Sequence, residues 1–208
     1  MKIAVNNLSK KIKSNIIIDN VSVDFETGHI YGLYGRNGSG KSVFLKLICS
    51  LYEPTSGEIL INGVNYSSTN NFPPDIRALI EKPHFFPDLS GYDNLRLLAK
   101  IQNKITDKEI LNSLDIVNLI DEKDKLYSKY SLGMKQKLGI AQVLMEDPKI
   151  MIFDEPFNGI EDESANKIRN MLKKMRKDKI IIIASHIKDD INDLADIRYK
   201  FENGKISK

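Results

Sequence analysis

The spacing of apolar and polar residues divides the chain into three parts. The first part holds short segments that are rich in β-branched residues and separated by turn formers, which is the pattern of strands. These segments are residues 2–12, 15–25, 28–35 and 57–65. Near the end, two continuous apolar runs cover residues 149–156 and 179–186, and such runs suit parallel strands that are buried on both faces.

The middle of the chain has the periodicity of amphipathic helices. The helical segments cover residues 91–105, 106–120 and 131–147. Ser90 and Thr106 stand where N-caps are expected, and another helix is expected to begin at Lys41 after a glycine-rich segment. The pattern therefore predicts an α/β core that is interrupted by a helical insertion, roughly residues 82–148.

Composition narrows the class of protein. The 208 residues suffice for one well-buried domain, and 31 Lys and Arg against 28 Asp and Glu leave a net charge of +3, too small to indicate nucleic-acid binding. The basic run at 173–179 is interpreted as a solvated helix face.

The single cysteine, Cys49, lies in an apolar helical pattern and is expected to be a buried core residue in a reducing compartment. No signal pattern is evident, and every apolar run is shorter than the ~18 residues that span a bilayer, so another chain would supply any membrane part.

The segment from Gly35 to Ser42 reads G-x-x-x-x-G-K-S between a predicted strand and a predicted helix. Glycines let backbone N–H groups turn inward around a polyphosphate, and the following helix points its positive end at the anion. Lys41 can reach the outer phosphates and the Ser42 hydroxyl can bind Mg²⁺. The alternative is an ordinary glycine-rich turn. The candidate nucleotide-binding residues are Gly35, Asn37, Gly38, Ser39, Gly40, Lys41, Ser42 and Val43.

Three polar side chains follow the two apolar runs. Asp154 and Glu155 come at the carboxyl end of the first run, where open α/β sheets bind ligands. Asp154 is predicted to hold hydrated Mg²⁺, and Glu155 to polarise the attacking water. His186 ends the second run and is predicted to donate a hydrogen bond to a γ-phosphate. The alternatives are a solvated acidic turn and a structural histidine.

The order of these motifs resembles the ATP-binding subunit of ABC transporters. The segment "SLGMKQ", which begins at Ser131, stands in the place of that family's serine–glycine signature, and Asp154 follows Ser131 by 23 residues. The stretch at 20–42 resembles the family's opening, and "ENGKI" at 202–206 resembles its closing hairpin. The resemblance covers essentially the whole chain.

This resemblance implies a single ABC ATPase domain over residues 1–208. It implies a P-loop NTPase (RecA-like) α/β core, residues 1–81 and 149–208, with a small N-terminal antiparallel β subdomain and a helical subdomain at 82–148 that contains the signature. It also implies that Ser131 and Gly133 bind the γ-phosphate held by a second ATPase subunit, identical or different. ATP and Mg²⁺ are the implied cofactors. A transmembrane permease subunit is the implied partner, at the cytoplasmic face of the membrane, and no nucleic acid is involved.

Several positions depart from the family pattern. Leu132 replaces the second glycine of the signature, and Glu81 stands where a glutamine is usual. The segment "SLGMKQKLGIA", which begins at Ser131, and the glutamate at position 81 together resemble the ATPases of bacitracin and lantibiotic resistance transporters and related peptide exporters, which favours export. Glu161 replaces a usual aspartate, Val43 replaces a threonine near the α-phosphate, and Ile12 falls near the place of the aromatic residue that stacks on adenine.

The segment that begins at Glu81 raises a separate prediction. Glu81 is expected to approach Mg²⁺ when two subunits close, and its loop, with Phe85 and Phe86, to lie where the membrane partner docks. A full charge beside an anionic nucleotide is tolerable only if the metal or a nearby cation offsets the repulsion. The alternative is an exposed loop acid, with both phenylalanines packed inside the helical insertion.

Two other classes of protein share some of these motifs. Soluble ABC proteins include translation factors, which carry two such domains in one chain, and repair ATPases, which insert long coiled coils that are not evident here. A small-molecule kinase would also have the phosphate loop but would not need the signature at Ser131. The transporter subunit therefore accounts for more of the sequence.

Overall fold

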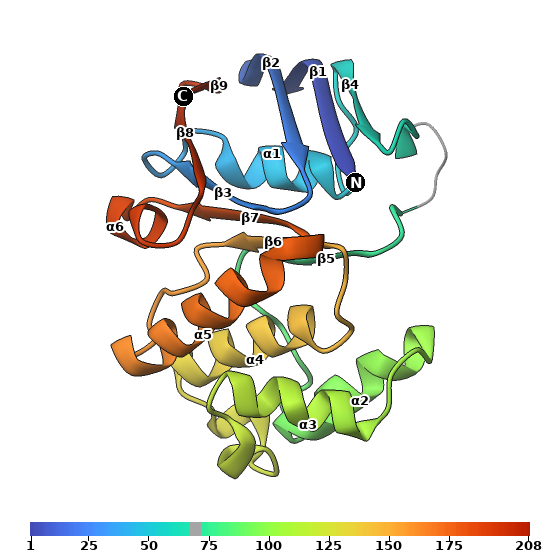
Figure 1. Ribbon diagram of the computed structural model, residues 1–208, viewed down its shortest axis with the longest axis vertical. Helices are drawn as coiled ribbons and strands as arrows, with labels where there is room; N and C mark the ends of the chain where they lie inside the picture. Colours follow the sequence, from blue (N-terminus) through green and yellow to red (C-terminus); the bar gives the residue numbers. More distant parts are fainter. Residues whose placement is uncertain (67–71) are drawn as a thin grey trace.

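The computed structural model describes residues 1–66 and 72–208, which form stacked layers (Figure 1). An antiparallel sheet forms the upper layer, and helix α1 (Lys41–Ile48) lies between it and a larger, mostly parallel sheet. Further helices cover the opposite face of the larger sheet. Among the described residues, no helix combines the length and the apolar character needed to cross a membrane.

The antiparallel sheet has the strand order β2–β1–β4 and confirms the strands predicted near the N-terminus. Its strands are β1 (Lys2–Ile12), β2 (Asn15–Glu26) and β4 (Ser56–Ile61). The prediction of a strand over residues 57–65 was too long at its end. Asn62 and Gly63 both have positive φ angles, 51° and 82°, so the chain turns immediately after Ile61.

The larger sheet has the order β5–β6–β7–β3–β8–β9, with the first five strands parallel and β9 antiparallel to β8. Its strands are β3 (His29–Tyr34), β5 (Ile76–Leu79), β6 (Ile150–Asp154), β7 (Ile180–Ser185), β8 (Ile197–Glu202) and β9 (Lys205–Ser207). The two apolar runs are the neighbouring strands β6 and β7, as predicted, and the hairpin of β8 and β9 matches the expected closing hairpin. The sequence pattern missed β5, which has only four residues.

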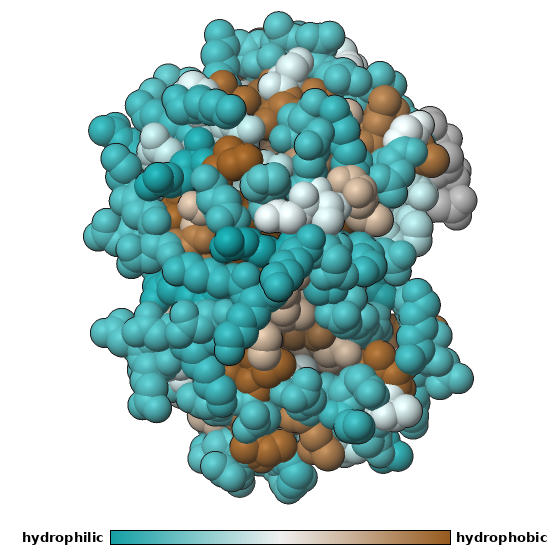
Figure 2. Space-filling model, viewed as in Figure 1, coloured by the Kyte–Doolittle hydropathy of each residue, from teal (hydrophilic) through white to brown (hydrophobic). Residues whose placement is uncertain are grey.

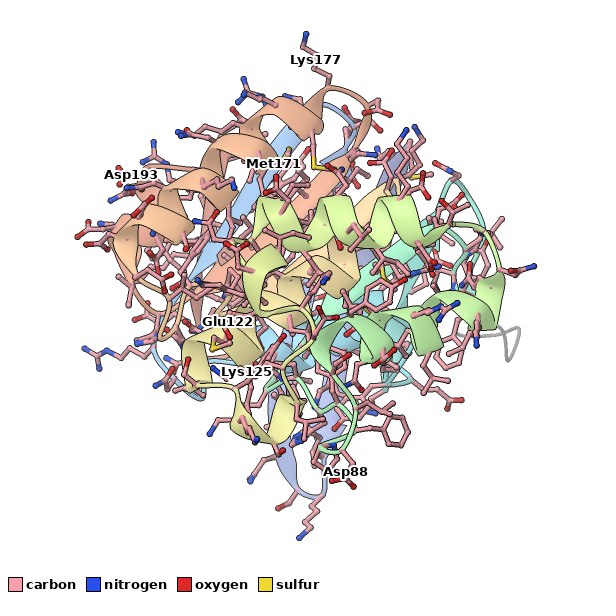
Figure 3. All side chains as sticks on the ribbon, turned by 90° about the horizontal axis from the view of Figure 1, so that it is seen from below. Asp88, Glu122, Lys125, Met171, Lys177 and Asp193 are labelled. Atoms are coloured by element: carbon pink, nitrogen blue, oxygen red, sulfur yellow. The ribbon has the colours of Figure 1, made fainter. Side chains whose placement is uncertain are left out.

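The helices between β5 and β6 follow the predicted caps. They are α2 (Gly91–Gln102), α3 (Asp107–Ile116) and α4 (Leu132–Leu144), with the 3₁₀ turns η2 (Ile120–Glu122) and η3 (Tyr127–Lys129) between α3 and α4. The Ser90 side chain accepts from the Asp93 N–H, and Thr106 forms a capping box with Glu109. In the view from below, the loop with Glu122 and Lys125 joins α3 to α4 (Figure 3).

After β6 the chain continues through α5 (Asp162–Met175), the 3₁₀ turn η4 (Arg176–Asp178) and the short α6 (Lys188–Asn192). The parallel sheet separates two apolar clusters because successive side chains of a strand point to opposite faces. Ile150 and Ile152 pack on the side of α1, where Cys49 is buried as predicted. Met151 and Phe153 pack on the side of α4 and α5. Because β3, β6 and β7 are parallel, their carboxyl ends lie at the same edge of the sheet, between the two clusters.

Candidate functional site

The glycine-rich loop joins β3 to α1, and its backbone requires glycine at particular points. Gly40 has a φ of 110°, and a Cβ there would lie 2.9 Å from the Ile17 carbonyl oxygen. A Cβ on Gly35 would lie 2.1 Å from the Phe201 carbonyl oxygen, so the loop passes directly against β8. Helix α1 begins at Lys41, and its N-terminal end therefore faces the loop. This is the local arrangement that binds phosphate.

Lys41 is held inside this loop. Its side chain is 5% exposed, and its Nζ donates to the carbonyl oxygens of Gly35 at 2.7 Å and Arg36 at 3.3 Å. Burial lowers the pKa of Lys41, and the nearby carboxylates of Glu155 and Asp154 oppose that change. The ammonium group therefore stands at the loop in a position to meet a phosphate.

Asp154 lies at the end of β6, opposite the first turn of α1. The Ser42 hydroxyl donates to its Oδ2 at 2.5 Å, and burial raises the pKa of Asp154. The Asp154 Oδ1 and the Ser39 Oγ are both buried and have no hydrogen-bond partner among the described residues. Buried polar atoms are normally paired, so these two atoms indicate a site for a ligand.

The oxygen donors of Ser42 and Asp154 fit Mg²⁺. Mg²⁺ is commonly bound through one or two carboxylates together with water and substrate phosphates. Within residues 1–66 and 72–208 there is no group of three or more His, Cys, Asp or Glu side chains that could hold a metal by itself. The Ser42 and Asp154 oxygens suit a metal that also binds polyphosphate and water.

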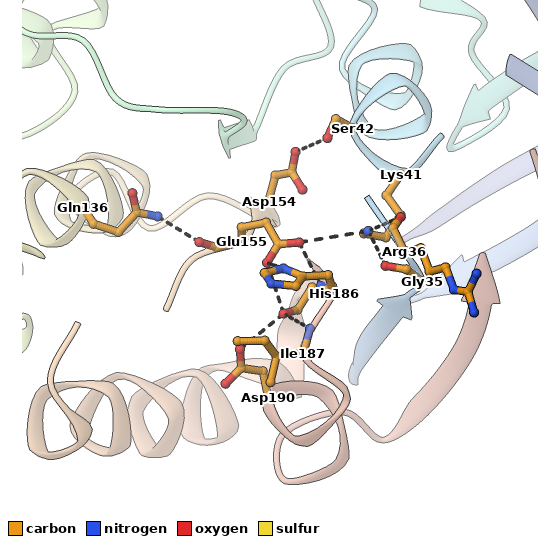
Figure 4. A network of polar contacts seen from close by, with 11 residues as sticks. Gly35, Arg36, Lys41, Ser42, Gln136, Asp154, Glu155, His186, Ile187 and Asp190 are labelled. Atoms are coloured by element: carbon orange, nitrogen blue, oxygen red, sulfur yellow. Dashed lines mark hydrogen bonds and ion pairs between the residues drawn. The ribbon is translucent and has the colours of Figure 1, made fainter. Parts of the chain in front are cut away.

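Glu155 and His186 form a connected pair beside the loop (Figure 4). The Glu155 Oε1 accepts from the His186 backbone N–H at 2.8 Å, and its Oε2 lies 2.8 Å from the His186 Nδ1. The Ser185 hydroxyl lies 3.2 Å from the same Oε2, and the Lys41 Nζ lies 4.0 Å from Oε1. The Glu155 backbone has a φ of 51°, and its N–H donates to the Ala184 carbonyl at 2.8 Å. The carboxylate is thus fixed next to Lys41.

The signature segment begins α4. Ser131 is exposed and caps the helix, because its Oγ accepts from the Met134 N–H at 3.2 Å. Gly133 is buried, and a Cβ there would lie 2.3 Å from the Gly159 carbonyl oxygen, so the helix packs closely on the loop after Glu155. Neither Ser131 nor Gly133 lines the pocket that contains Ser42 and Asp154. Leu132 and Gln136 of the same segment do line it, so within one chain the signature borders this pocket through these two residues and not through Ser131 or Gly133.

Sequence reasoning missed the residues that connect α4 to this site. The Gln136 side chain donates to the Glu155 carbonyl at 3.0 Å, and the buried Lys137 forms an ion pair with Glu161. These partners lie 19 and 24 residues apart in the chain, so no local pattern predicts them. Hydrogen bonds from Lys137 and Ser164 lower the pKa of Glu161 to about 2.

Glu81 reaches the rim of the same site. It lines a pocket of about 390 Å³ together with Ser42, Asp154 and Glu155, and its side chain is 63% exposed and ion-paired with Lys46. Glu81 is therefore both an exposed loop acid and a neighbour of the candidate metal ligands.

The other residues predicted to contact a ligand or partner do not line this pocket. Phe85 packs edge-on against Tyr127 at 5.3 Å between ring centroids, whereas Phe86 is 59% exposed, so only one of the two phenylalanines is available as an external anchor. Ile12 is 39% exposed at the end of β1, and Val43 packs against the cluster around α1.

Known proteins share this sequence and fold. The profile of the ABC transporter family matches residues 18–158. An uncharacterized ABC transporter ATP-binding protein of Bacillus subtilis, YybJ, is 40% identical over 98% of this chain and 94% of its own length. The bacitracin transport ATP-binding protein BcrA of Enterococcus faecalis is 36% identical over 94% of this chain, which spans 64% of that relative. The lantibiotic transport ATP-binding protein SrtF of Streptococcus pyogenes is 34% identical over 97% of this chain and 87% of its own length.

Solved structures agree. A structure described as the ATP-binding subunit of an ABC transporter has a TM-score of 0.89 and 25% identity, and covers 100% of this chain and 89% of its own. A dimeric bacterial ABC transporter cassette with 21% identity has a TM-score of 0.90 and covers 99% of this chain and 97% of its own. This likeness supports the fold. The predicted P-loop NTPase fold and the resemblance are therefore confirmed, and this chain belongs to the ATP-binding proteins of the ABC transporter family and is an ATPase.

Proposed function

We propose that this chain is the energy subunit of an exporter, and that two ATPase subunits close around two ATP molecules to drive a separate transmembrane permease. The export of a peptide or antimicrobial compound is supported by the names of relatives that act in bacitracin and lantibiotic transport. The subunit would work at the cytoplasmic face of the membrane. Its closed and open states would alternate because ATP favours the closed dimer and hydrolysis removes that preference.

We assign the nucleotide to the loop from Gly35 to Ser42 and to Val43, which follows this loop in α1. Lys41 would bind the outer phosphates, and Ser42 and Asp154 would hold Mg²⁺, with Glu81 joining them when the dimer closes. When bound, Mg²⁺ would neutralise phosphate charge. The unpartnered Oδ1 of Asp154 is the support for this placement.

The observation that carries the proposal is the fixed carboxylate of Glu155. His186 holds both of its oxygens at 2.8 Å, and Oε1 stands 4.0 Å from the Lys41 ammonium. A carboxylate held beside the phosphate-binding lysine is placed to accept a proton from water. We therefore assign Glu155 as the general base and His186 as the residue that positions it and contacts the γ-phosphate.

A dimer would account for the exposed position of Ser131. Ser131 caps α4 at the surface and lies outside the pocket of its own chain, so it is available to a nucleotide held by another subunit. Gly133 lets the same helix end pack against the neighbouring loop. A helix N-terminus attracts anions, which supports a contact between Ser131 and the partner's γ-phosphate.

The helical part is the proposed docking region for the permease. We assign residues 82–148 to a helical subdomain and residues 1–81 and 149–208 to the nucleotide-binding core, since α2 to α4 lie between β5 and β6 in the chain. Figure 2 shows separate apolar patches on a largely hydrophilic face. Phe86, Leu97 and Ile101 are exposed at 59%, 42% and 77% near the entry to this region and on α2. Recovery of one membrane protein with the tagged chain from native membranes tests this assignment.

Trapping experiments test the catalytic part. Glu155→Gln should bind ATP but hydrolyse it about 10²–10⁴-fold more slowly, and so accumulate a dimer in size-exclusion chromatography with ATP. The matched control is the double variant with Lys41→Ala, which should stay monomeric because it binds ATP poorly. Near-normal turnover of Glu155→Gln would show that another group activates the water.

Mixing tests the contribution of Ser131. Lys41→Ala and Ser131→Arg chains are each inactive in this scheme, but a mixed dimer holds one composite site that is intact. Mixing should restore part of the ATPase activity. No gain at any mixing ratio, with mixed dimers present, would contradict the assignment of Ser131 to the partner's nucleotide.

A further inference from the structure

A lysine of α1 and the acid after β5 meet at the rim of the pocket. Lys46 lies four residues after Ser42, so the two side chains share one face of α1. The Lys46 Nζ lies 2.5 Å from the Glu81 Oε1, across 35 residues of sequence. The helix that carries the candidate metal ligand therefore also carries the cation that contacts Glu81.

The two partners are not equally fixed. The Lys46 side chain is 18% exposed, and its Nζ lies 5.3 Å from the centroid of the Tyr52 ring. The Glu81 side chain is 63% exposed, and its backbone has a φ of 65°, outside any strand or helix. Lys46 is thus the anchored member, and its ammonium determines where the Glu81 carboxylate lies.

The charges of the pocket favour a cation beside Glu81. The lining includes three carboxylates, those of Glu81, Asp154 and Glu155, against the single ammonium of Lys82, and a polyphosphate would add further negative charge. Like charges at short range repel strongly where water is partly excluded. An exposed ion pair stabilises a fold only slightly, so the pair matters more for the charge beside the nucleotide than for folding.

We propose that Lys46 is a positioning residue that holds and neutralises the Glu81 carboxylate at the rim of the nucleotide pocket, so that ATP binds without an uncompensated negative charge beside its phosphates. This inference rests on the proposed placement of ATP on the loop from Gly35 to Ser42. It concerns binding and does not require the chemical step.

Calorimetry of ATP binding to the full chain in EDTA tests the proposal without metal or turnover. Lys46→Met should weaken binding about 5- to 10-fold at about 0.01 M salt, and less at about 0.15 M, because salt screens the charge of Glu81. Glu81→Gln should tighten binding about twofold in the wild-type background. In the Lys46→Met background the same change should tighten it about 10-fold and restore affinity to within about twofold of the wild type, since paired residues are not additive.

Lys82→Met is the matched control, since Lys82 lines the same pocket but takes no part in the ion pair. Adding Glu81→Gln to Lys82→Met should tighten ATP binding only about twofold, as it does in the wild-type background. Wild-type affinity of Lys46→Met would overturn the proposal, and so would a weakened Lys46→Met that Glu81→Gln does not rescue. Thermal melting verifies that each variant is folded.

Lys41→Ala separates the failure of this inference from failure of the underlying placement. If Lys41→Ala binds ATP as the wild type does, the nucleotide does not lie on this loop. If Lys41→Ala loses binding while the pair of Lys46 and Glu81 behaves additively, the placement of ATP stands and the role of Lys46 is wrong.

Discussion

The ion pair of Lys137 and Glu161 couples the signature helix α4 to the start of α5, and its two members should respond unequally to mutation. The Lys137 side chain is 7% exposed, whereas that of Glu161 is 59% exposed. Glu161→Gln leaves a buried ammonium without its carboxylate. Lys137→Met keeps the apolar stem in place and leaves a carboxylate in water. We therefore expect Glu161→Gln to destabilise the protein more than Lys137→Met does.

The size of each loss of stability depends on how deeply the remaining charge is buried. Removing one partner of a fully buried pair costs about 3–5 kcal/mol. Water reaches Glu161, so we expect about 1–2 kcal/mol for Glu161→Gln and less than about 1 kcal/mol for Lys137→Met. The pKa of Glu161, lowered from 4.5 to about 2, corresponds to roughly 3 kcal/mol for a shielded group, and its 59% exposure reduces this to about 1 kcal/mol.

The sign of the pH dependence is also determined. A carboxyl with a lowered pKa in the folded state contributes stability above its unfolded pKa, and this stability is lost as the pH falls toward the folded pKa. The advantage of the wild type over Lys137→Met should therefore be complete at pH 6 and shrink between pH 4.5 and about 2.

Urea unfolding followed by circular dichroism at pH 7, 4.5 and 3 measures these differences. Glu163→Gln is the matched control, because it removes an exposed carboxylate from the first turn of the same helix and should change stability by less than about 0.5 kcal/mol. Equal costs for Glu161→Gln and Lys137→Met, or a wild-type advantage over Lys137→Met that stays constant down to pH 3, would refute the reasoning.

Other parts of the structure give further predictions. Gly133→Ala places a Cβ 2.3 Å from the Gly159 carbonyl, and thermal melting should show about 1–3 kcal/mol of destabilisation; an unchanged melting temperature would contradict the packing. Burial raises the pKa of Cys49 to about 12, so a thiol reagent at pH 8 should react only after denaturation, and rapid labelling of the native chain would count against this. Asp190→Asn should lower stability and ATPase activity because Asp190 contacts both an arginine of α5 and the serine before His186, whereas the exposed Asp189→Asn should change neither.

Local patterns in the sequence were sufficient for several elements of the site. The glycine loop, the acidic end of β6 and the caps at Ser90 and Thr106 each depend on residues within one turn or strand of each other. The continuous apolar runs predicted β6 and β7 because both faces of those strands are covered. The short β5 lacked such a signal, since four residues contain too little periodicity to separate a strand from a loop.

Only the tertiary structure showed which polar and charged groups contact one another. Lys46 reaches Glu81, Lys137 reaches Glu161, and Gln136 reaches the Glu155 backbone, across 35, 24 and 19 residues. The sequence suggested that the metal or a nearby cation would offset the charge of Glu81, but it did not show which of the 31 lysines and arginines could do so. That choice depends on the packing of α1 beside the end of β5 and of α4 against the loop after β6. The residues therefore determined the chemistry of the phosphate loop, and the fold determined how the surrounding charges are held in place.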